Sequence, residues 1–354
     1  MKTKLSLFSV LLGLSTSVGG GEFSRWNALP ELPAALGVAG PFAGVHNDVL
    51  LVAGGANFPE PVWENDKVWH RRIYALPLAG DRKWRVVGAL ARPVGYGASV
   101  SVAEGVVCMG GNDAERVFDD VFLLKSDGSI KALPSLPAPA CNGAAATIGR
   151  EVYFFPGMRT GELASASQDF LRLNLDNPDA GWESLASLPA PGRALSVLIA
   201  QNNGKGDRLY LIGGRLEEDS GAITFLADVF EFDPSQGNAS WTKMASMPGP
   251  LAAGTGVAVG EHHIFMIAGA DGSLMAKADD LKLDHPGFPK SIYSYDTTKN
   301  KWIDAGESPV NQVTTTAVTW NDLTFLVTGE VKPRVRTKQG WEISLNPAGA
   351  LKGE

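Results

Sequence analysis

The stretch Val49–Gly55, VLLVAGG, decides the fold, because an apolar run that ends in a glycine pair returns along the whole chain. Successive pairs are 46 to 60 residues apart, which is a regular period. The pairs, some of them in a degraded form, are Gly54-Gly55, Gly110-Gly111, Pro156-Gly157, Gly213-Gly214, Ala268-Gly269 and Thr328-Gly329. This periodicity predicts an architecture built from six copies of one structural unit.

Each unit contains the same order of strand patterns. A strand rich in small residues, such as GYGASVSV, precedes the apolar run, and a second apolar strand such as RIYALPL (Arg72–Leu78) follows the glycine pair. A tryptophan then marks a fourth strand in four units, at Trp84, Trp182, Trp241 and Trp302. One small sheet cannot bury both of its faces, but six sheets in a ring can.

This pattern resembles the kelch repeat, and the resemblance covers nearly all of the chain. It implies an all-β fold, a six-bladed kelch-type β-propeller. The last unit lacks a terminal tryptophan strand, and Trp26 in SRWNALPELP has no three strands before it. We therefore expect Ser24–Leu29 to be the outer strand of the sixth blade, so that the N-terminal strand joins the last blade and closes the ring.

Composition limits the class of protein. The chain has 354 residues, of which 41 are glycine and 22 proline, and only 19% are charged, which favours short strands joined by tight turns. The net charge of -7 argues against nucleic acid or an anionic membrane surface as the main partner. No feature of the sequence sets an oligomeric state.

The first residues have the pattern of a secretory signal peptide. Lys2 and Lys4 precede the apolar run Leu5–Leu14, and small residues follow it. We expect residues 1–21 to be the signal peptide and residues 22–354 to be a single propeller domain. The apolar run is too short for a permanent membrane span, so a periplasmic or secreted protein is expected.

Cys108 and Cys141 are the only cysteines. An exported protein could join them in one disulfide, but their apolar, small-residue strand contexts favour two buried free thiols. No second cysteine or histidine stands at ligand spacing, so no metal site is expected on them.

Polar residues near the glycine pairs are the candidates for a binding site, since equivalent positions of a repeat lie at equivalent places around a ring. They are Asn57, Asn112, Arg159, Arg215, Asp271 and Glu330. We expect Asn57, Arg193 and Arg215 to bind substrate, although Arg193 in PAPGRALS either points to the axis or caps a turn. Taken alone, Glu330 could also be an ordinary solvated carboxylate.

The stretch Phe325–Trp341, FLVTGEVKPRVRTKQGW, has charges that no other unit repeats. Its segment Gly329–Thr337 resembles the Gly-Glu-x-Lys-Pro-x-x-Arg-Thr signature of N-acetylneuraminate epimerases, the kelch-type sialic acid mutarotases. The blocks Gly37–Gly44 and Ala53–Ala56 also match that family, in an order similar to its cyclically permuted branch. Arg334 departs from the family, whose other members often have glycine at this position.

The resemblance implies that Glu330 is the catalytic acid/base and that Arg336 is its catalytic or substrate-binding partner. The implied reaction is α/β anomer interconversion of N-acetylneuraminate, a small-molecule sugar acid, with no cofactor and no metal. Two other functions fit the same pattern: a non-catalytic kelch propeller that binds carbohydrate or protein, and a mutarotase of another acidic sugar.

Overall fold

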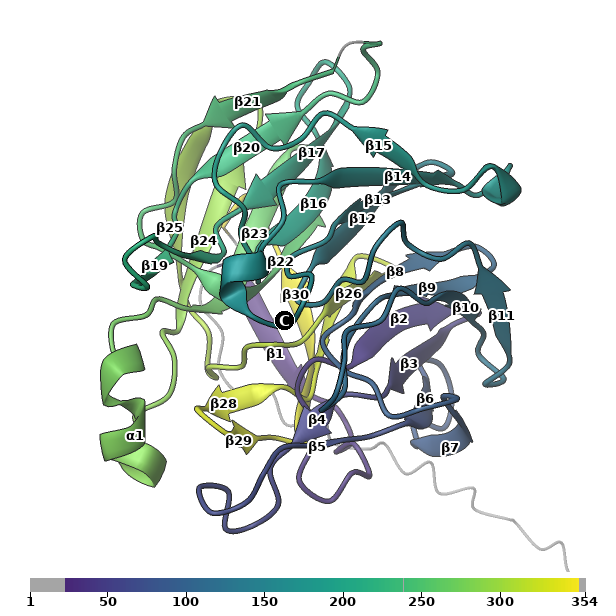
Figure 1. Cartoon of the computed structure of the whole chain (residues 1–354), viewed down its shortest axis with the longest axis vertical. Coiled ribbons are helices and arrows are strands. Elements are labelled where there is room, and N and C mark those ends of the chain that lie inside the picture. Colours follow the sequence, from purple (N-terminus) through teal and green to yellow (C-terminus); the bar gives the residue numbers. More distant parts are fainter. Residues whose placement is uncertain (1–22, 238, 350–354) are drawn as a thin grey trace, which may run out of the picture.

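The computed structural model describes residues 23–237 and 239–349. The predicted signal peptide at residues 1–21 lies outside these residues. Six four-stranded antiparallel sheets radiate from the middle of the molecule (Figure 1), so the predicted six-bladed β-propeller is confirmed. In the described ranges, no helix has the length and apolarity that crossing a membrane would require.

The blades follow one another along the chain. The first contains β2 (Phe42–His46), β3 (Val49–Ala53), β6 (Arg72–Pro77) and β7 (Arg85–Ala89). The second contains β8 (Ala98–Val102), β9 (Gly105–Met109), β10 (Val121–Leu124) and β11 (Ile130–Leu133). The third contains β12 (Ala144–Ile148), β13 (Glu151–Phe155), β14 (Phe170–Asn174) and β15 (Glu183–Leu185).

The second half of the ring repeats the pattern. The fourth blade contains β16 (Val197–Asn202), β17 (Asp207–Ile212), β20 (Val229–Phe232) and β21 (Trp241–Met244). The fifth contains β22 (Ala252–Val259), β23 (His263–Ala270), β24 (Ser291–Asp296) and β25 (Lys301–Glu307). The sixth contains β26 (Ala317–Trp320), β27 (Leu323–Val327), β30 (Gly340–Leu345) and β1 (Ser24–Ala28).

Short elements lie in the loops between these strands. The small hairpins are β4 (Ala56–Asn57) with β5 (Val68–Trp69), β18 (Arg215–Glu217) with β19 (Ile223–Phe225), and β28 (Glu330–Lys332) with β29 (Val335–Arg336). The helical turns are η1 (Leu163–Ser165), η2 (Pro178–Ala180), η3 (Met275–Lys277), α1 (Ala278–Leu281) and η4 (Lys282–Asp284).

The apolar runs are continuous because both faces of each blade are covered by a neighbouring blade. In β3, Leu50 and Val52 pack with Phe325 of the sixth blade. Leu51, which points to the opposite face, packs with Cys108 of the second blade. The core is therefore a series of sandwiched layers around the axis.

The N-terminal strand belongs to the sixth blade. β1 pairs with β30 over the register Ser24↔Leu345 to Ala28↔Trp341. Trp26 is fully buried there, donates a 3.1 Å hydrogen bond from Nε1 to Ser24 Oγ and meets the ring of Trp341 edge-on. Residues more than 300 positions apart in the sequence thus share one sheet.

A closed ring of six backbone hydrogen bonds joins the blades around the axis. Each member donates its N–H to the carbonyl of the member from the preceding blade, with N···O distances of 2.7 to 2.9 Å. The members are Gly40, Tyr96, Asn142, Leu195, Ala253 and Thr314. Their φ angles lie between 53° and 62°, in the left-handed region that L-residues other than glycine rarely adopt.

Both cysteines are free and buried. Burial raises the pKa of the Cys141 thiol to about 11 and raises that of Cys108 well above its usual value. Neither thiol forms the disulfide that the sequence permitted, and both keep their protons at neutral pH.

Candidate active site

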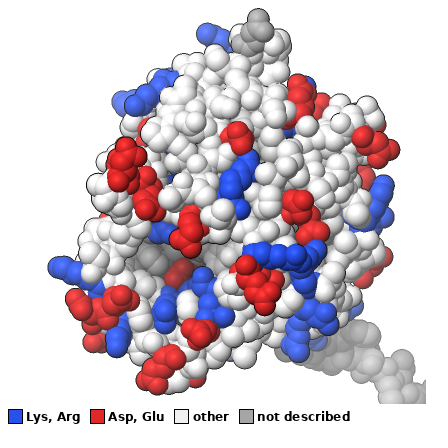
Figure 2. Space-filling view, viewed as in Figure 1, with Lys and Arg blue, Asp and Glu red and all other residues white. Residues whose placement is uncertain are grey.

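A cavity of about 520 Å³ opens on the face that carries the β28–β29 hairpin and α1. Figure 2 shows this face hollowed, with both basic and acidic side chains around the hollow. Five members of the backbone hydrogen-bond ring line the cavity: Tyr96, Asn142, Leu195, Ala253 and Thr314. The ring is therefore its floor.

Backbone pairing decides which side chains enter this cavity. The first residue after a glycine pair bonds to the residue that precedes a ring member, as Arg215 does with Ala194 and Glu330 with Val313. This places the first residue after each pair beside the floor. Five such residues line the cavity: Asn112, Met158, Arg215, Ala270 and Glu330.

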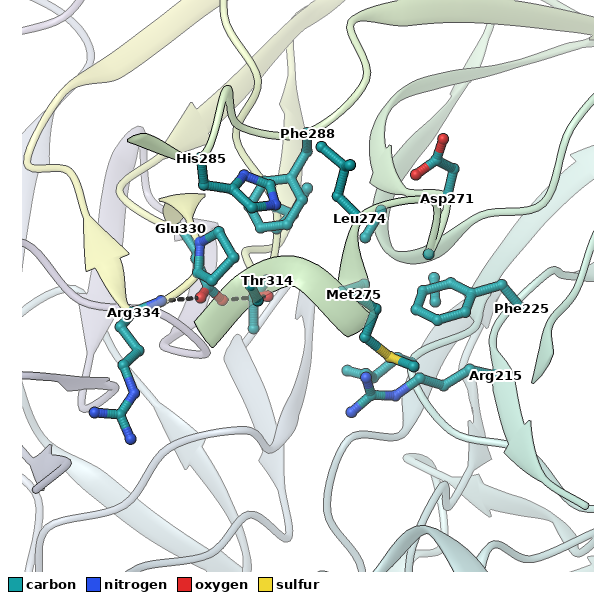
Figure 3. A pocket seen from close by; sticks show the side chains of 18 of the residues that line it. Arg215, Phe225, Asp271, Leu274, Met275, His285, Phe288, Thr314, Glu330 and Arg334 are labelled. Atoms are coloured by element: carbon teal, nitrogen blue, oxygen red, sulfur yellow. Dashed lines mark hydrogen bonds between the residues drawn. The ribbon is translucent and has the colours of Figure 1, made fainter. Parts of the chain in front are cut away.

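Glu330 begins β28, and its carboxylate is held by three contacts. Oε1 accepts a 2.8 Å hydrogen bond from the backbone N–H of Arg334 and lies 2.8 Å from Nη1 of Arg336. Oε2 has a longer contact of 3.4 Å with the hydroxyl of Thr314 (Figure 3). The side chain is 18% exposed, so Oε2 is the freer oxygen and remains accessible from the cavity.

Arg336 lies opposite Glu330 in the hairpin, so the two side chains share one face of the ladder. Its side chain is only 3% exposed and is positioned by Ala56, whose carbonyl accepts from Nε at 3.4 Å, and by the Tyr96 hydroxyl, 3.4 Å from Nη2. The close approach of Nη1 to Oε1 is not aligned as a hydrogen bond. The Nη1 hydrogens thus have no aligned acceptor among the described residues.

Arg215 supplies a second guanidinium to the cavity. Its Nε is buried without a hydrogen-bond acceptor in the described part of the chain, and its guanidinium lies 6.0 Å from the ring of Phe225. Burial lowers the pKa of Arg215, and the negative charge of Glu330 opposes that shift. An arginine still stays protonated, so this is a buried cation that can accept an anion.

The structure places the other two predicted substrate-binding residues elsewhere. Arg193 is fully buried, forms an ion pair with Asp228 and does not line the cavity. Asn57 is buried as well, donating to the Gly37 carbonyl at 2.9 Å and contacting His70 Nε2 at 2.9 Å. Asn57 is the second residue after its glycine pair and lies in β4, where a shift of one position turns a side chain to the opposite face. Asp271, also second after its pair, follows the end of β23 and does line the cavity.

Several cavity residues did not follow from the repeat. Tyr96 and Thr314 belong to the hydrogen-bond ring and line the cavity. The sequence feature that could have indicated them is a short polar or aromatic residue just before a strand rich in small residues. His285 and Phe288 come from the segment between β23 and β24, whose length was its only indication. In the described ranges, no three His, Cys, Asp or Glu side chains gather as ligands for a metal ion.

The fold and the site define a six-bladed β-propeller with a carboxylate–guanidinium pair over its central cavity. The chain belongs to the N-acetylneuraminate epimerase family, because the model of that family matches residues 15–131 and 133–278. The family resemblance read from the sequence is thereby confirmed. The match ends before Glu330, so the roles of Glu330 and Arg336 depend on the geometry and on the short signature alone.

Curated relatives are similar over part of their length. An N-acetylneuraminate epimerase of Salmonella typhi is 28% identical over 236 residues, 60% of this chain and 58% of the relative. One from Yersinia pestis (strain Pestoides F) is 36% identical over 109 residues, 26% of this chain and 27% of the relative. The solved structure of YjhT has a TM-score of 0.70 and 17% identity, covering 90% of this chain and 97% of that one, which shows the fold alone.

Proposed function

We propose that the protein accelerates the interconversion of the α and β anomers of N-acetylneuraminate. The single observation that carries this proposal is the arrangement of Glu330. One carboxylate oxygen is fixed by Arg334 N–H and Arg336, and the other is free to face a ligand. Family membership and the names of the relatives support the same reaction and the same substrate.

The reaction needs a group that takes a proton and returns it. Oε2 of Glu330 removes the proton of the anomeric hydroxyl, the bond from the anomeric carbon to the ring oxygen breaks, and the ring oxygen receives the proton. Rotation of the open keto form presents its other face, and the same steps in reverse close the ring. One positioned carboxylate can serve as base and then as acid, either directly or through water.

The permanent carboxylate of the sugar acid explains the guanidinium groups. Among the described residues, Nη1 of Arg336 has no aligned acceptor and Arg215 forms no ion pair with a carboxylate. A guanidinium binds a carboxylate by paired, charge-assisted hydrogen bonds. Holding that carboxylate would place the adjacent anomeric centre near Glu330.

Anomer-exchange NMR with α-N-acetylneuraminate and purified protein tests the proposal. The wild type is expected to accelerate exchange, and a thousandfold effect would need only about 4 kcal/mol of barrier reduction. Glu330→Gln should abolish the acceleration with the fold retained, because an amide keeps the shape but cannot exchange the proton. Glu115→Gln, an exposed carboxylate outside the cavity, is the matched control and should keep full activity.

The same experiment separates the rival functions. Binding without faster exchange would favour a non-catalytic propeller, and faster exchange with another sugar alone would favour a different mutarotase. Full activity in Glu330→Gln would remove the proposed base.

We also propose that the protein is exported, which is supported by the apolar run after Lys2 and Lys4. We propose further that its family blocks stand in a permuted order, which is supported by the position of the Gly37–Gly44 block.

A further inference from the structure

One end of the cavity gathers cations around an aromatic ring. The guanidinium of Arg334 lies 4.6 Å from the ring centre of Phe58 and 5.1 Å from that of Trp63. Lys67 Nζ lies 5.6 Å from the Phe58 ring and 4.8 Å from the Tyr96 ring. Within the described residues, neither Lys67 nor Arg334 forms an ion pair with a carboxylate.

The same end of the cavity has several hydrogen-bond donors and few hydrogen-bond acceptors among the described residues. Trp63 lines the cavity, and its Nε1 is buried with no acceptor in the part of the chain that the structure describes. Within residues 23–237 and 239–349, Nη1 of Arg334 reaches only the carbonyl of Val62, at 3.3 Å. An ammonium, a guanidinium and an indole N–H at one end of a cavity suit an anion.

The backbone conformation at Arg334 favours glycine, so the turn itself does not require the arginine side chain. Pro333 and Arg334 form the two-residue turn between β28 and β29, and Arg334 has φ of 68°. A turn with proline first and a positive φ second favours glycine in the second place. Glycine would also keep the N–H that bonds to Glu330, so what arginine adds is its guanidinium.

This second cationic group is separate from Arg215. Figure 3 shows Arg215 and Arg334 on opposite sides of Glu330 and Thr314. Arg336 lies 5.1 Å from the same Phe58 ring and contacts Glu330, so Arg215 is the group that takes the permanent carboxylate here. A ligand that lies over Glu330 can then present its second anion to the Arg334 side.

We propose that the cavity takes an acidic sugar with a second anionic group, which Lys67, Trp63 and Arg334 bind at the end remote from Arg215. This inference rests on the proposed function and makes its substrate class more specific. The second group is a phosphate ester or a second carboxylate, since both supply the oxygen acceptors that this end of the cavity lacks.

Three probes test it: N-acetylneuraminate, its 9-phosphate ester, and the α2,8-linked disaccharide of N-acetylneuraminate, which has a free reducing end. Anomer-exchange NMR gives KM for each probe, and calorimetry gives Kd. At least one of the two probes with a second anionic group should have a KM about tenfold lower than that of N-acetylneuraminate, the factor expected for one charge-assisted contact. The probe that shows the preference identifies the source of the second anion.

The variants connect the preference to these residues. Arg334→Gly and Lys67→Met should each reduce the ratio of the N-acetylneuraminate KM to the KM of the preferred probe toward unity. Lys277→Met removes an exposed cation that does not line the cavity, and it should leave the ratio unchanged.

Equal KM and Kd values for all probes in the wild type would overturn the inference, and so would a preference that both variants retain. If no probe exchanges faster with the protein, the proposed function fails instead. The ratio of calorimetric Kd values then decides the second-anion site by itself.

Discussion

Arg193 and Arg215 show how one residue type takes two roles in this protein. Arg193 is fully buried and forms an ion pair with Asp228, and its Nη1 also donates to the Gly213 carbonyl. The guanidinium of Arg215 lies 6.0 Å from the ring of Phe225, and among the described residues it forms no ion pair with a carboxylate. A paired buried charge holds a structure together, whereas an unpaired one in a cavity is available to a ligand.

Arg215→Met should therefore damage binding more than folding. We expect KM for N-acetylneuraminate to rise by about tenfold or more, because a charge-assisted contact of roughly 1.5–3 kcal/mol is lost. Anomer-exchange NMR over a range of sugar concentrations measures it. An unchanged KM would show that the substrate carboxylate lies elsewhere.

Arg193→Met provides the contrast. It leaves the Asp228 carboxylate without its buried partner, and losing one member of such a pair costs about 3–5 kcal/mol of folding free energy. Urea unfolding should show this loss, and KM should not change in the protein that remains folded. A rise in KM at unchanged stability would return Arg193 to the binding site.

At the scale of the element, the repeat predicted the blades better than it predicted the loops. Glycine pairs and continuous apolar runs fix where each strand runs, so all six sheets followed from the sequence. Which side chains line the cavity depends on which residue after a glycine pair hydrogen-bonds to the residue before a ring member. That pairing is between distant parts of the chain, so the local sequence does not reveal it. Glu330 and Arg215 line the cavity because each stands first after its pair, whereas Asn57 stands second in β4 and lies outside the cavity.

His70 follows β5 and contacts Asn57 of β4, and its titration predicts that folding stability depends on pH. Burial, and then the charge of Arg72, lowers the pKa of His70, and His70 holds the amide of Asn57. The unfolded chain, with an ordinary histidine pKa near 6.5, then takes up a proton that the folded protein does not. Stability should accordingly fall as the pH drops below about 6.5.

Urea midpoints measured from pH 7.5 to 5.5 check the direction. His70→Gln should lose less stability over this range than the wild type, since glutamine can donate to Asn57 without titrating. Burial also lowers the pKa of His263 and His285, so the variant should reduce the effect and not abolish it. Equal slopes for variant and wild type would exclude His70 as a source.

At the scale of the whole molecule, the blades are held together at two distances from the axis. Near the axis, the six-membered hydrogen-bond ring fixes the floor of the cavity in backbone conformations that cost L-residues about 1–2 kcal/mol each. Far from the axis, β1 completes the sheet of β26, β27 and β30. The strained floor persists only if the surrounding blades hold it, so the outer strand should affect the site as well as the stability.

Removing β1 tests this link. A chain that begins at Pro30 loses Trp26, which is fully buried against Trp341, and leaves the edge of β30 unpaired. The loss of such a tryptophan alone costs about 3–5 kcal/mol, so the shortened chain should unfold at a much lower urea concentration than one that begins at Glu22. Because one ring connects all blades, fluorescence and circular dichroism should report the same shifted transition, and anomer exchange should be lost with it. A shortened chain with an unchanged midpoint, or one that loses only its sixth blade while the rest unfolds as before, would show that the blades are stable without the strand that joins the two ends of the propeller.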